Sequence, residues 1–261
     1  LSLSYAPVSS TFLYASYGVA YKSGTYNIVN IFREPAYVEP ERATSYEVGL
    51  KYQSGKGAMR FNLAAFSDRV TNLQLGFVSL MSGGVINFES VPVTRSRGVE
   101  FDGAWLPIRG RAPLALSFSG SYIDSEYRRF PSGPGFNENT GLYEGDLELS
   151  GKRTIYAPWF SGTIGLTQGI RVPEGVYELS VAARYNGGYF TDADNTTREP
   201  AFYVLNSRLG YRHEPWKLGI YIFSTNLLNR RYRTVNVETD FGTIQSLARS
   251  RDVGLRLTLD W

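Results

Sequence analysis

The clearest pattern along this chain is an alternation of apolar and polar residues with a period of two. It is most regular at the end of the chain, where polar residues separate the apolar ones. The apolar positions there are Val253, Leu255, Leu257, Leu259 and Trp261. Because successive side chains of a β-strand point to opposite faces, this pattern predicts a strand with one apolar and one polar face.

The same alternation recurs along the whole chain. It is clear in residues 45–52 and 177–185 and weaker elsewhere. Counting such segments predicts about eleven strands. They cover residues 1–5, 12–21, 45–52, 59–65, 99–105, 114–122, 160–166, 177–185, 202–211, 218–224 and 253–261.

The connections between these strands alternate in length. Short turns marked by Pro, Gly and Ser are expected near residues 6–10, 53–57, 107–111, 171–175 and 213–216. Long polar links are expected near residues 22–43, 70–94, 124–156, 187–200 and 228–249. Outer-membrane barrels have short periplasmic turns and long extracellular loops. The pattern therefore predicts a transmembrane antiparallel β-barrel whose last strand ends on the periplasmic side.

The two faces of the predicted strands support a membrane location. One face holds Leu, Val, Ile and aromatic residues, and the other holds polar residues, which is the reverse of a water-soluble barrel. No apolar run approaches the roughly 18 residues that a transmembrane helix needs. Aromatic residues near strand ends, which we expect at the membrane interfaces, are Tyr52, Trp105, Tyr122 and Trp261. The alternative is that they are ordinary hairpin aromatics.

Composition and charge exclude several other functions. The 27 basic and 24 acidic residues are interspersed, so we expect no nucleic-acid binding. The chain has no Cys, and its one histidine, His213, lies in a predicted turn, where we expect it to be exposed. No nucleophile elbow, phosphate loop or metal motif is present, so neither an enzyme nor a bound cofactor is expected.

Two acidic segments are candidates for binding a hard cation through carboxylates. One is the string Glu144, Asp146 and Glu148, and the other is the loop formed by residues 192–197. Neither offers a full set of ligands. We therefore interpret both as solvated external loops and expect no metal site.

Several short motifs, taken in order, resemble the C-terminal half of the barrel of TonB-dependent receptors. Each motif alone is moderately specific, but together they cover nearly the whole chain. They are Tyr14-Ala15-Ser16-Tyr17-Gly18 with residues 22–27, Pro40-Glu41 with residues 45–51, Gly98-Val99-Glu100-Phe101, Ala157-Pro158, and residues 226–232.

The resemblance implies a 22-stranded barrel whose lumen is blocked by an N-terminal plug. It also implies a TonB box that couples transport to the inner-membrane proton gradient. Residues 1–261 then form the C-terminal portion of the barrel, without the plug domain and the N-terminal strands. The implied location is the outer membrane of a Gram-negative bacterium. The implied partners are membrane lipid, the TonB complex acting through the plug, and the barrel assembly machinery.

The sequence does not identify the ligand. A ferric siderophore is the first expectation from the resemblance, with vitamin B12, haem, saccharides or other plant-derived compounds as alternatives. A passive porin and a purely structural barrel are the alternative functions. Within the long loops, the residues predicted to contact a ligand are Tyr26, Tyr37, Tyr143, Tyr189 and Phe190. The assembly signal is predicted in Leu255, Leu257, Leu259 and Trp261.

Overall fold

The fold is a single antiparallel sheet of eleven strands, each paired with its neighbour along the chain. It is taken from a computed structural model, which describes residues 1–27, 36–80 and 84–259. The strands are β1 (Ser2–Val8), β2 (Thr11–Lys22), β5 (Glu41–Gln53), β6 (Met59–Val78), β7 (Ile86–Ile108), β8 (Leu114–Arg129), β11 (Phe160–Val172), β12 (Gly175–Asn186), β15 (Phe202–His213), β16 (Leu218–Thr225) and β19 (Asp252–Leu259). Every strand predicted from the alternation is therefore confirmed.

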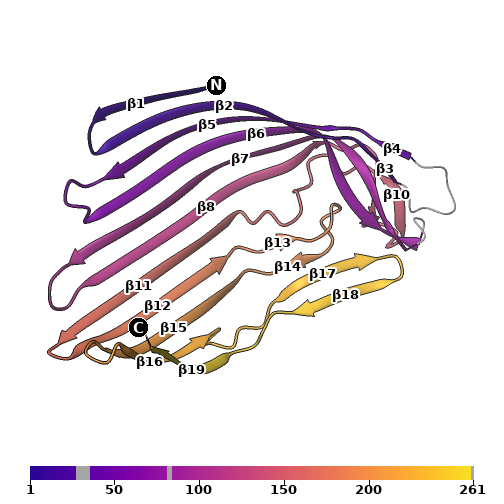
Figure 1. Cartoon of the computed structure of the whole chain (residues 1–261). Helices are drawn as coiled ribbons and strands as arrows, with labels where there is room; N and C mark the ends of the chain where they lie inside the picture. Colours follow the sequence, from indigo (N-terminus) through magenta and orange to yellow (C-terminus); the bar gives the residue numbers. More distant parts are fainter. Residues whose placement is uncertain (28–35, 81–83, 260–261) are drawn as a thin grey trace.

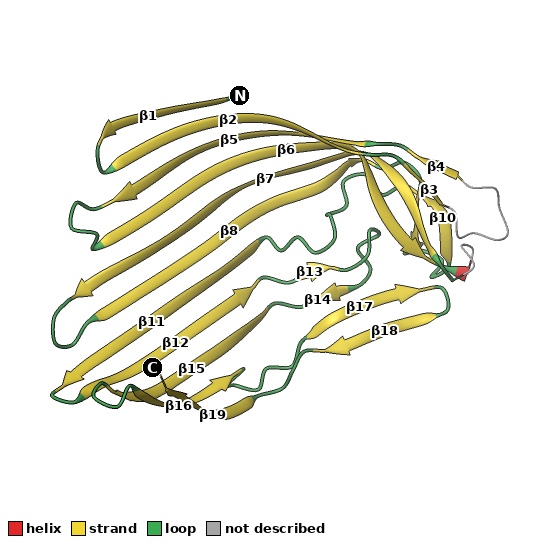
Figure 2. Cartoon of the chain, in the orientation of Figure 1, coloured by secondary structure: helices red, strands yellow, loops and turns green. Residues whose placement is uncertain are grey.

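The sheet curves into an open trough, as Figures 1 and 2 show. Its two edges are β1 and β19, which do not pair with each other among the described residues. The eleven strands thus form part of a barrel wall and not a closed barrel. The short turns lie at one end of the trough, and the long connections lie at the other (Figure 1). This arrangement confirms four of the five predicted long links, and the connection between β6 and β7 is the exception.

Four long connections carry a small hairpin of their own. The pairs are β3 (Thr25–Asn27) with β4 (Ala36–Val38), β9 (Gly133–Phe136) with β10 (Tyr143–Leu147), β13 (Tyr189–Phe190) with β14 (Arg198–Glu199), and β17 (Arg233–Thr239) with β18 (Gly242–Leu247). The prediction of a long polar link at residues 70–94 was wrong, because β6 and β7 continue through most of it. The ladder skips Asn72, which has φ 56°, and Pro92, which has no N–H to donate. These two residues interrupt the alternation and hide the strands.

The buried apolar core lies at the long-loop end of the trough. Its buried members are Val91, Tyr127, Phe130, Leu149 and Ala193, which come from β7, β8 and two long connections. Leu73, Leu75 and Phe77 of β6 pack against it. The long loops therefore form a packed layer above the sheet. Burial of these side chains against one another gives the loops a fixed shape.

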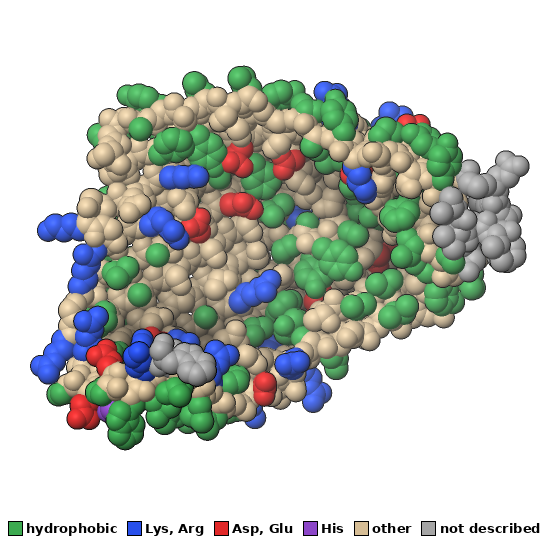
Figure 3. All heavy atoms as spheres, viewed as in Figure 1, with side chains coloured by type: hydrophobic (Ala, Val, Ile, Leu, Met, Phe, Trp, Pro, Cys, Tyr) green, Lys and Arg blue, Asp and Glu red, His purple; other side chains and the backbone are tan. Residues whose placement is uncertain are grey.

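The two faces of the sheet differ in the way the alternation predicts. On β19, Leu255 and Leu257 lie opposite Ile222 and Ile220, whereas Arg256 lies opposite Tyr221 on the other face. The side chains of Leu255 and Leu257 are 64% and 63% exposed on the convex outer face. Figure 3 shows the hollowed inner face, where charged side chains are spread over the wall. Trp261 lies outside the described residues.

Glycines on the inner face make room for aromatic rings of the neighbouring strand. Gly210 of β15 lies opposite Tyr221 of β16, and Gly254 of β19 lies opposite Phe223. A Cβ added at Gly210 would stand 2.1 Å from Tyr221 Cδ1 and 2.6 Å from the carbonyl oxygen of Ile220. No rotation of the ring removes the second clash.

We therefore expect Gly210→Ala to destabilise the barrel by about 1–3 kcal/mol, the usual cost of overpacking. The measurement is urea unfolding of the protein refolded into detergent. Gly18→Ala is the matched control, because a Cβ at Gly18 of β2 meets nothing within 4 Å. Equal midpoints for the two variants would contradict the close packing at Gly210.

Candidate ligand-binding site

A cavity of about 560 Å³ opens on the inner face near the long-loop end. We call it the vestibule cavity. It is lined by β12, β15 and β16 and by the connections above them. Its aromatic and basic lining residues are Tyr156, Tyr189, Phe202, Tyr232, Arg184, Arg233 and Arg249.

The aromatic side chains of the vestibule cavity are held in pairs. The ring centroids of Tyr156 and Tyr189 lie 5.4 Å apart. The rings of Phe202 and Tyr232 are stacked, with centroids 4.2 Å apart and planes 10° from parallel. Burial raises the pKa of the Tyr189 phenol, so this hydroxyl stays neutral and available as a hydrogen-bond donor. The cavity therefore presents fixed flat surfaces with polar tips.

The arginines of the cavity differ in their partners. Arg233 Nε lies 2.7 Å from Glu199 Oε2, and the Glu199 side chain is nearly fully buried. Within the described part of the chain, Arg184 and Arg249 form no ion pair. A guanidinium group binds carboxylate or phenolate oxygens through two parallel N–H donors. The cavity therefore offers two uncompensated positive charges beside aromatic rings, an arrangement that suits an anionic aromatic ligand.

Asn226 shapes the wall of the vestibule cavity that carries Tyr232 and Arg249. Its Nδ2 donates to the carbonyl oxygens of Arg230 at 2.9 Å and Arg249 at 3.2 Å, and its Oδ1 accepts from Arg230 N at 2.8 Å. Asn226 has φ 50°, a left-handed conformation that Asn tolerates better than most residues. The motif at residues 226–232 therefore ties the two ends of the last long connection together.

Of the five loop residues predicted to contact a ligand, only Tyr189 lines the vestibule cavity. Tyr26 and Tyr37 pair across the β3–β4 hairpin with centroids 5.1 Å apart. Tyr143 packs edge-on against Phe136 at 5.2 Å, and Phe190 lies below the Arg198 guanidinium at 5.8 Å. The structure does not bring the five together, and their contact with ligand stays a prediction.

Most residues of the vestibule cavity could not be predicted from the sequence. Arg184 carried a signal, because it falls on the polar face of an alternating strand, β12. Tyr232 ends the motif at residues 226–232, which indicates the family but does not predict a ligand contact for Tyr232. Tyr156 carried no signal. Its backbone is left-handed, with φ 55°, and its N–H donates to the carbonyl oxygen of Phe190, in a connection distant in sequence, at 2.8 Å.

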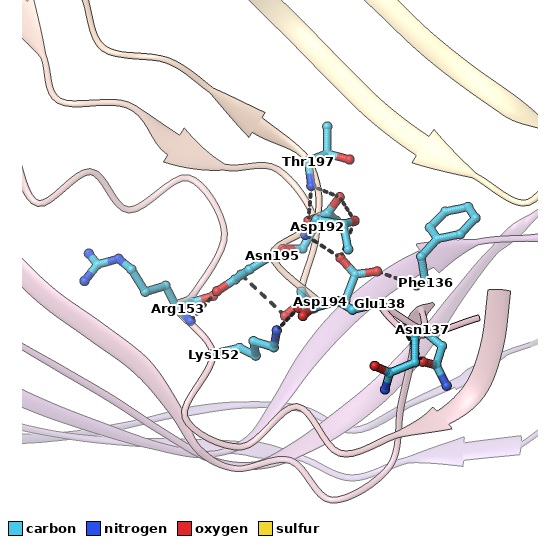
Figure 4. A network of polar contacts seen from close by, with 12 residues as sticks. Phe136, Asn137, Glu138, Lys152, Arg153, Asp192, Asp194, Asn195 and Thr197 are labelled. Atoms are coloured by element: carbon cyan, nitrogen blue, oxygen red, sulfur yellow. Dashed lines mark hydrogen bonds and ion pairs between the residues drawn. The ribbon is translucent and has the colours of Figure 1, made fainter. Parts of the chain in front are cut away.

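The acidic loop at residues 192–197 is packed into the structure, so the expectation of a solvated loop was wrong. Figure 4 shows its carboxylates pointing at neighbouring backbone. Asp194, 3% exposed, accepts hydrogen bonds from Phe136 N at 2.5 Å and Thr196 N at 2.9 Å. Asp192 accepts from Thr197 N at 2.9 Å. These acceptors hold the turn in place, and the described residues contain no group of three or more His, Cys, Asp or Glu placed for a metal.

We expect the stability of this loop to depend on pH. Burial and the adjacent Asp194 raise the pKa of Asp192 to about 6 from its ordinary value of 3.8. The folded loop then binds a proton that the unfolded chain has lost, so this contribution is full at low pH and is lost as pH rises through about 6. Hydrogen exchange of amides 191–197, corrected for intrinsic rates, should show stronger protection at pH 5 than at about pH 7.5. Asp192→Asn should abolish the difference, and a pH dependence that survives it would contradict this origin.

His213 lies at the opposite, short-turn end and is half-buried, so the expectation of an exposed side chain was wrong. Its ring packs on Trp216 at 4.6 Å, and its Nε2 lies 3.6 Å from Glu174. The packing within the turn covers it. His213 is thus separated from the vestibule cavity by the length of the strands (Figure 1).

Among the described residues, no helix is long and apolar enough to cross a membrane.

Comparison with known proteins agrees with this architecture. Residues 1–227 match the family model for the TonB dependent receptor-like β-barrel. The pesticin receptor of Yersinia pestis is 23% identical over 264 residues, which cover 100% of this chain and 35% of that protein. The ferrioxamine B receptor of Salmonella typhimurium is 24% identical over 182 residues, covering 67% of this chain and 22% of that protein.

Solved structures share the fold. The ferric yersiniabactin uptake receptor from Yersinia pestis superposes with a TM-score of 0.80 at 21% identity, covering 100% of this chain and 36% of that one. The ferric preacinetobactin receptor from Acinetobacter baumannii gives a TM-score of 0.69 at 18% identity, covering 98% of this chain and 35% of that one. The chain spans 35% of the length of the pesticin receptor. The matched family consists of transport receptors of the Gram-negative outer membrane, and with 227 of its residues inside the family model this chain belongs to the TonB-dependent receptors, as part of their β-barrel.

Proposed function

We propose that this chain is part of an outer-membrane receptor that takes up a ferric siderophore in a TonB-dependent manner. The observation that carries the proposal is the vestibule cavity, in which Arg184 and Arg249 stand beside paired aromatic rings on the inner face. The names of its relatives, receptors for ferric yersiniabactin, ferric preacinetobactin and ferrioxamine B, support the same class of ligand. The excess positive charge favours a siderophore that is anionic when iron is bound.

The proposed function is tested in a strain that lacks the full-length gene. Growth under iron restriction, with single ferric siderophores as the iron source, should be lost for one of them and restored by the gene. Uptake of radioactive iron on that siderophore should also stop when the proton gradient is collapsed. Uptake that continues without the gradient would indicate a passive pore. Iron and siderophore should enter chemically unchanged, because we propose no enzymatic step.

We also propose that the rest of the barrel and the plug lie outside residues 1–261. The open sheet supports this, since the edge strands β1 and β19 leave backbone groups unpaired, which is costly in hydrocarbon. Eleven strands are half of a 22-stranded barrel. Coupling to the TonB complex would run through that plug. The outer face would contact membrane lipid.

The C-terminal strand is the proposed signal for the barrel assembly machinery. Leu255, Leu257 and Leu259 lie on one exposed face of β19, and Trp261 continues the same alternation in sequence. We expect deletion of Trp261 from the full-length receptor to lower its amount in the outer membrane, measured by quantitative blotting of membrane fractions. Trp216→Ala, in the exposed turn between β15 and β16, is the matched control. An unchanged yield after the deletion would remove Trp261 from the signal.

A further inference from the structure

A second cavity, of about 520 Å³, lies on the outer face of the sheet near the long-loop end. We call it the arginine cavity. It is lined by Arg69 of β6, Arg95 of β7, Arg128 and Arg129 of β8, and Thr44 and Tyr46 of β5. The residues of the vestibule cavity take no part in it.

The strand register assigns the arginine cavity to the outer face. Arg69 lies opposite both Thr44 and Arg95. Ala65 lies on the same face of β6, four positions before Arg69, and it is paired with Val48 and Val99. That face carries the apolar side chains of the barrel, which form an apolar band. The arginines therefore lie just beyond one end of this band. Thr44 is near the start of β5 at Glu41, which follows a long connection. The arginines paired alongside it therefore lie at the long-loop end of the sheet.

A β-bulge in β8 concentrates the charge. Arg95 lies opposite Glu126, but the register shifts between Thr94 and Val93, and Val93 lies opposite Arg129. Regular alternation would send Arg128 and Arg129 to opposite faces. The bulge allows both side chains to line the same cavity. Bulges of this kind re-aim side chains and are common beside functional sites.

The arginines of this cavity outnumber the acidic groups that face them. Glu126 Oε1 accepts from Arg95 at 2.5 Å and from Arg128 at 3.1 Å. Arg69 and Arg129 form no ion pair with any described residue. Four guanidinium groups therefore meet one carboxylate, an excess of three positive charges. Arg95 Nε is buried and has no hydrogen-bond partner among the described residues. Such charges repel one another unless an anion joins them.

The neighbouring aromatic residues mark the level of this cavity. Tyr46, which lines the cavity, is exposed, and its ring lies 5.1 Å from that of Tyr17 on β2. Tyrosine rings on the apolar face of a membrane barrel sit at the head-group level. The arginine cavity then opens where the phosphates of the outer leaflet lie. Its four guanidinium groups fit phosphate oxygens, which they bind through paired N–H donors.

We propose that the arginine cavity binds the phosphorylated head group of a lipid in the outer leaflet of the membrane. The inference rests on the outer-membrane location and not on the identity of the siderophore. Arg69 and Arg129 supply positive charges that no carboxylate neutralises, and Arg95 Nε supplies a hydrogen-bond donor that has no partner among the described residues. The bound lipid neutralises the cluster and holds β6, β7 and β8 together above the apolar band.

The test uses the full-length receptor in detergent and native mass spectrometry. The probes are diphosphorylated lipid A, the same lipid without phosphates, and inorganic phosphate. Wild-type receptor should retain the diphosphorylated lipid and lose most binding when the phosphates are removed. The double variant Arg69→Gln and Arg129→Gln should bind the diphosphorylated lipid about 30-fold more weakly, since one arginine at a membrane surface is worth about fivefold. Arg69→Lys with Arg129→Lys should fall between the two.

Arg111→Gln with Arg171→Gln is the control, because it removes the same charge at the short-turn end and should bind like wild type. Heat-modifiable migration on gels checks that each variant is folded. Equal retention of phosphorylated and dephosphorylated lipid by wild type would overturn the proposal, with no variant needed. So would unchanged binding by the folded glutamine variant. Displacement of the lipid by millimolar inorganic phosphate would assign the cavity to free phosphate instead.

Discussion

Replacing Tyr156, Tyr189 and Tyr232 together with alanine should weaken binding of the ferric siderophore by about 100-fold or more. Aromatic residues in a preformed site are frequent hot spots, and truncating one costs about 2 kcal/mol or more, although such costs are not additive. These three rings line the vestibule cavity and are braced by neighbours, so little of their order is created on binding. The measurement is ligand titration by fluorescence quenching with the purified full-length receptor.

The matched control is the double variant Tyr177→Ala and Tyr211→Ala. It removes a ring pair, with centroids 4.6 Å apart, near the short-turn end of β12 and β15, outside the vestibule cavity. The control should change the affinity far less than the triple variant does. Arg184→Gln with Arg249→Gln should weaken binding as well, and it should lower the salt dependence of the affinity. Undiminished affinity of the triple variant would move the site to the plug or the other half of the barrel.

Leu257→Arg should destabilise the membrane-embedded receptor, because a cation on the lipid face costs about 2–4 kcal/mol near the midplane and less toward either interface. Leu257 is 63% exposed on the outer face of β19 and lies opposite Ile220. A guanidinium at this position would have to reach water through the apolar side chains around it. Reversible urea unfolding in lipid vesicles measures the difference in free energy.

Thr258→Arg is the control for the facing of β19. Thr258 lies opposite Gly219, on the inner face that also carries Arg256 and Tyr221. A charge there meets the water-filled side of the wall, so the cost should be far smaller. Comparable losses at Leu257 and Thr258 would mean that the facing assigned to β19 is wrong.

The sequence predicted the strands because the bilayer imposes a strict rule on each of them. Outward positions that meet the hydrocarbon must be apolar, and successive residues alternate in direction, so Leu255 and Leu257 identify the face of β19 without any tertiary information. The strands were not predicted correctly at residues 70–94, where the chain lies beyond the hydrocarbon and outward positions need not be apolar. Beyond the apolar band, Asn72 and Pro92 interrupt the alternation, and β6 and β7 were read as a loop.

The candidate site was less predictable, because it depends on contacts between residues distant in sequence. The loop tyrosines Tyr26 and Tyr37 were correctly placed in a long connection, but that connection lies away from the vestibule cavity. Phe202 and Tyr232 stack although a whole hairpin, β15–β16, separates them along the chain. No local pattern encodes such a pairing.

The sequence by itself determined the eleven strands, their facing, all the turns and long connections except that between β6 and β7, and the resemblance to the receptor family. These features follow from short-range rules of strand geometry and membrane burial. Only the tertiary structure decided which loop residues meet. It brought Arg184 beside Tyr189 in the vestibule cavity, and the bulge in β8 gathered Arg128 and Arg129 beside Arg69. The reason is physical: a charge or ring acquires a binding role from the groups that surround it, and register and loop packing choose those groups.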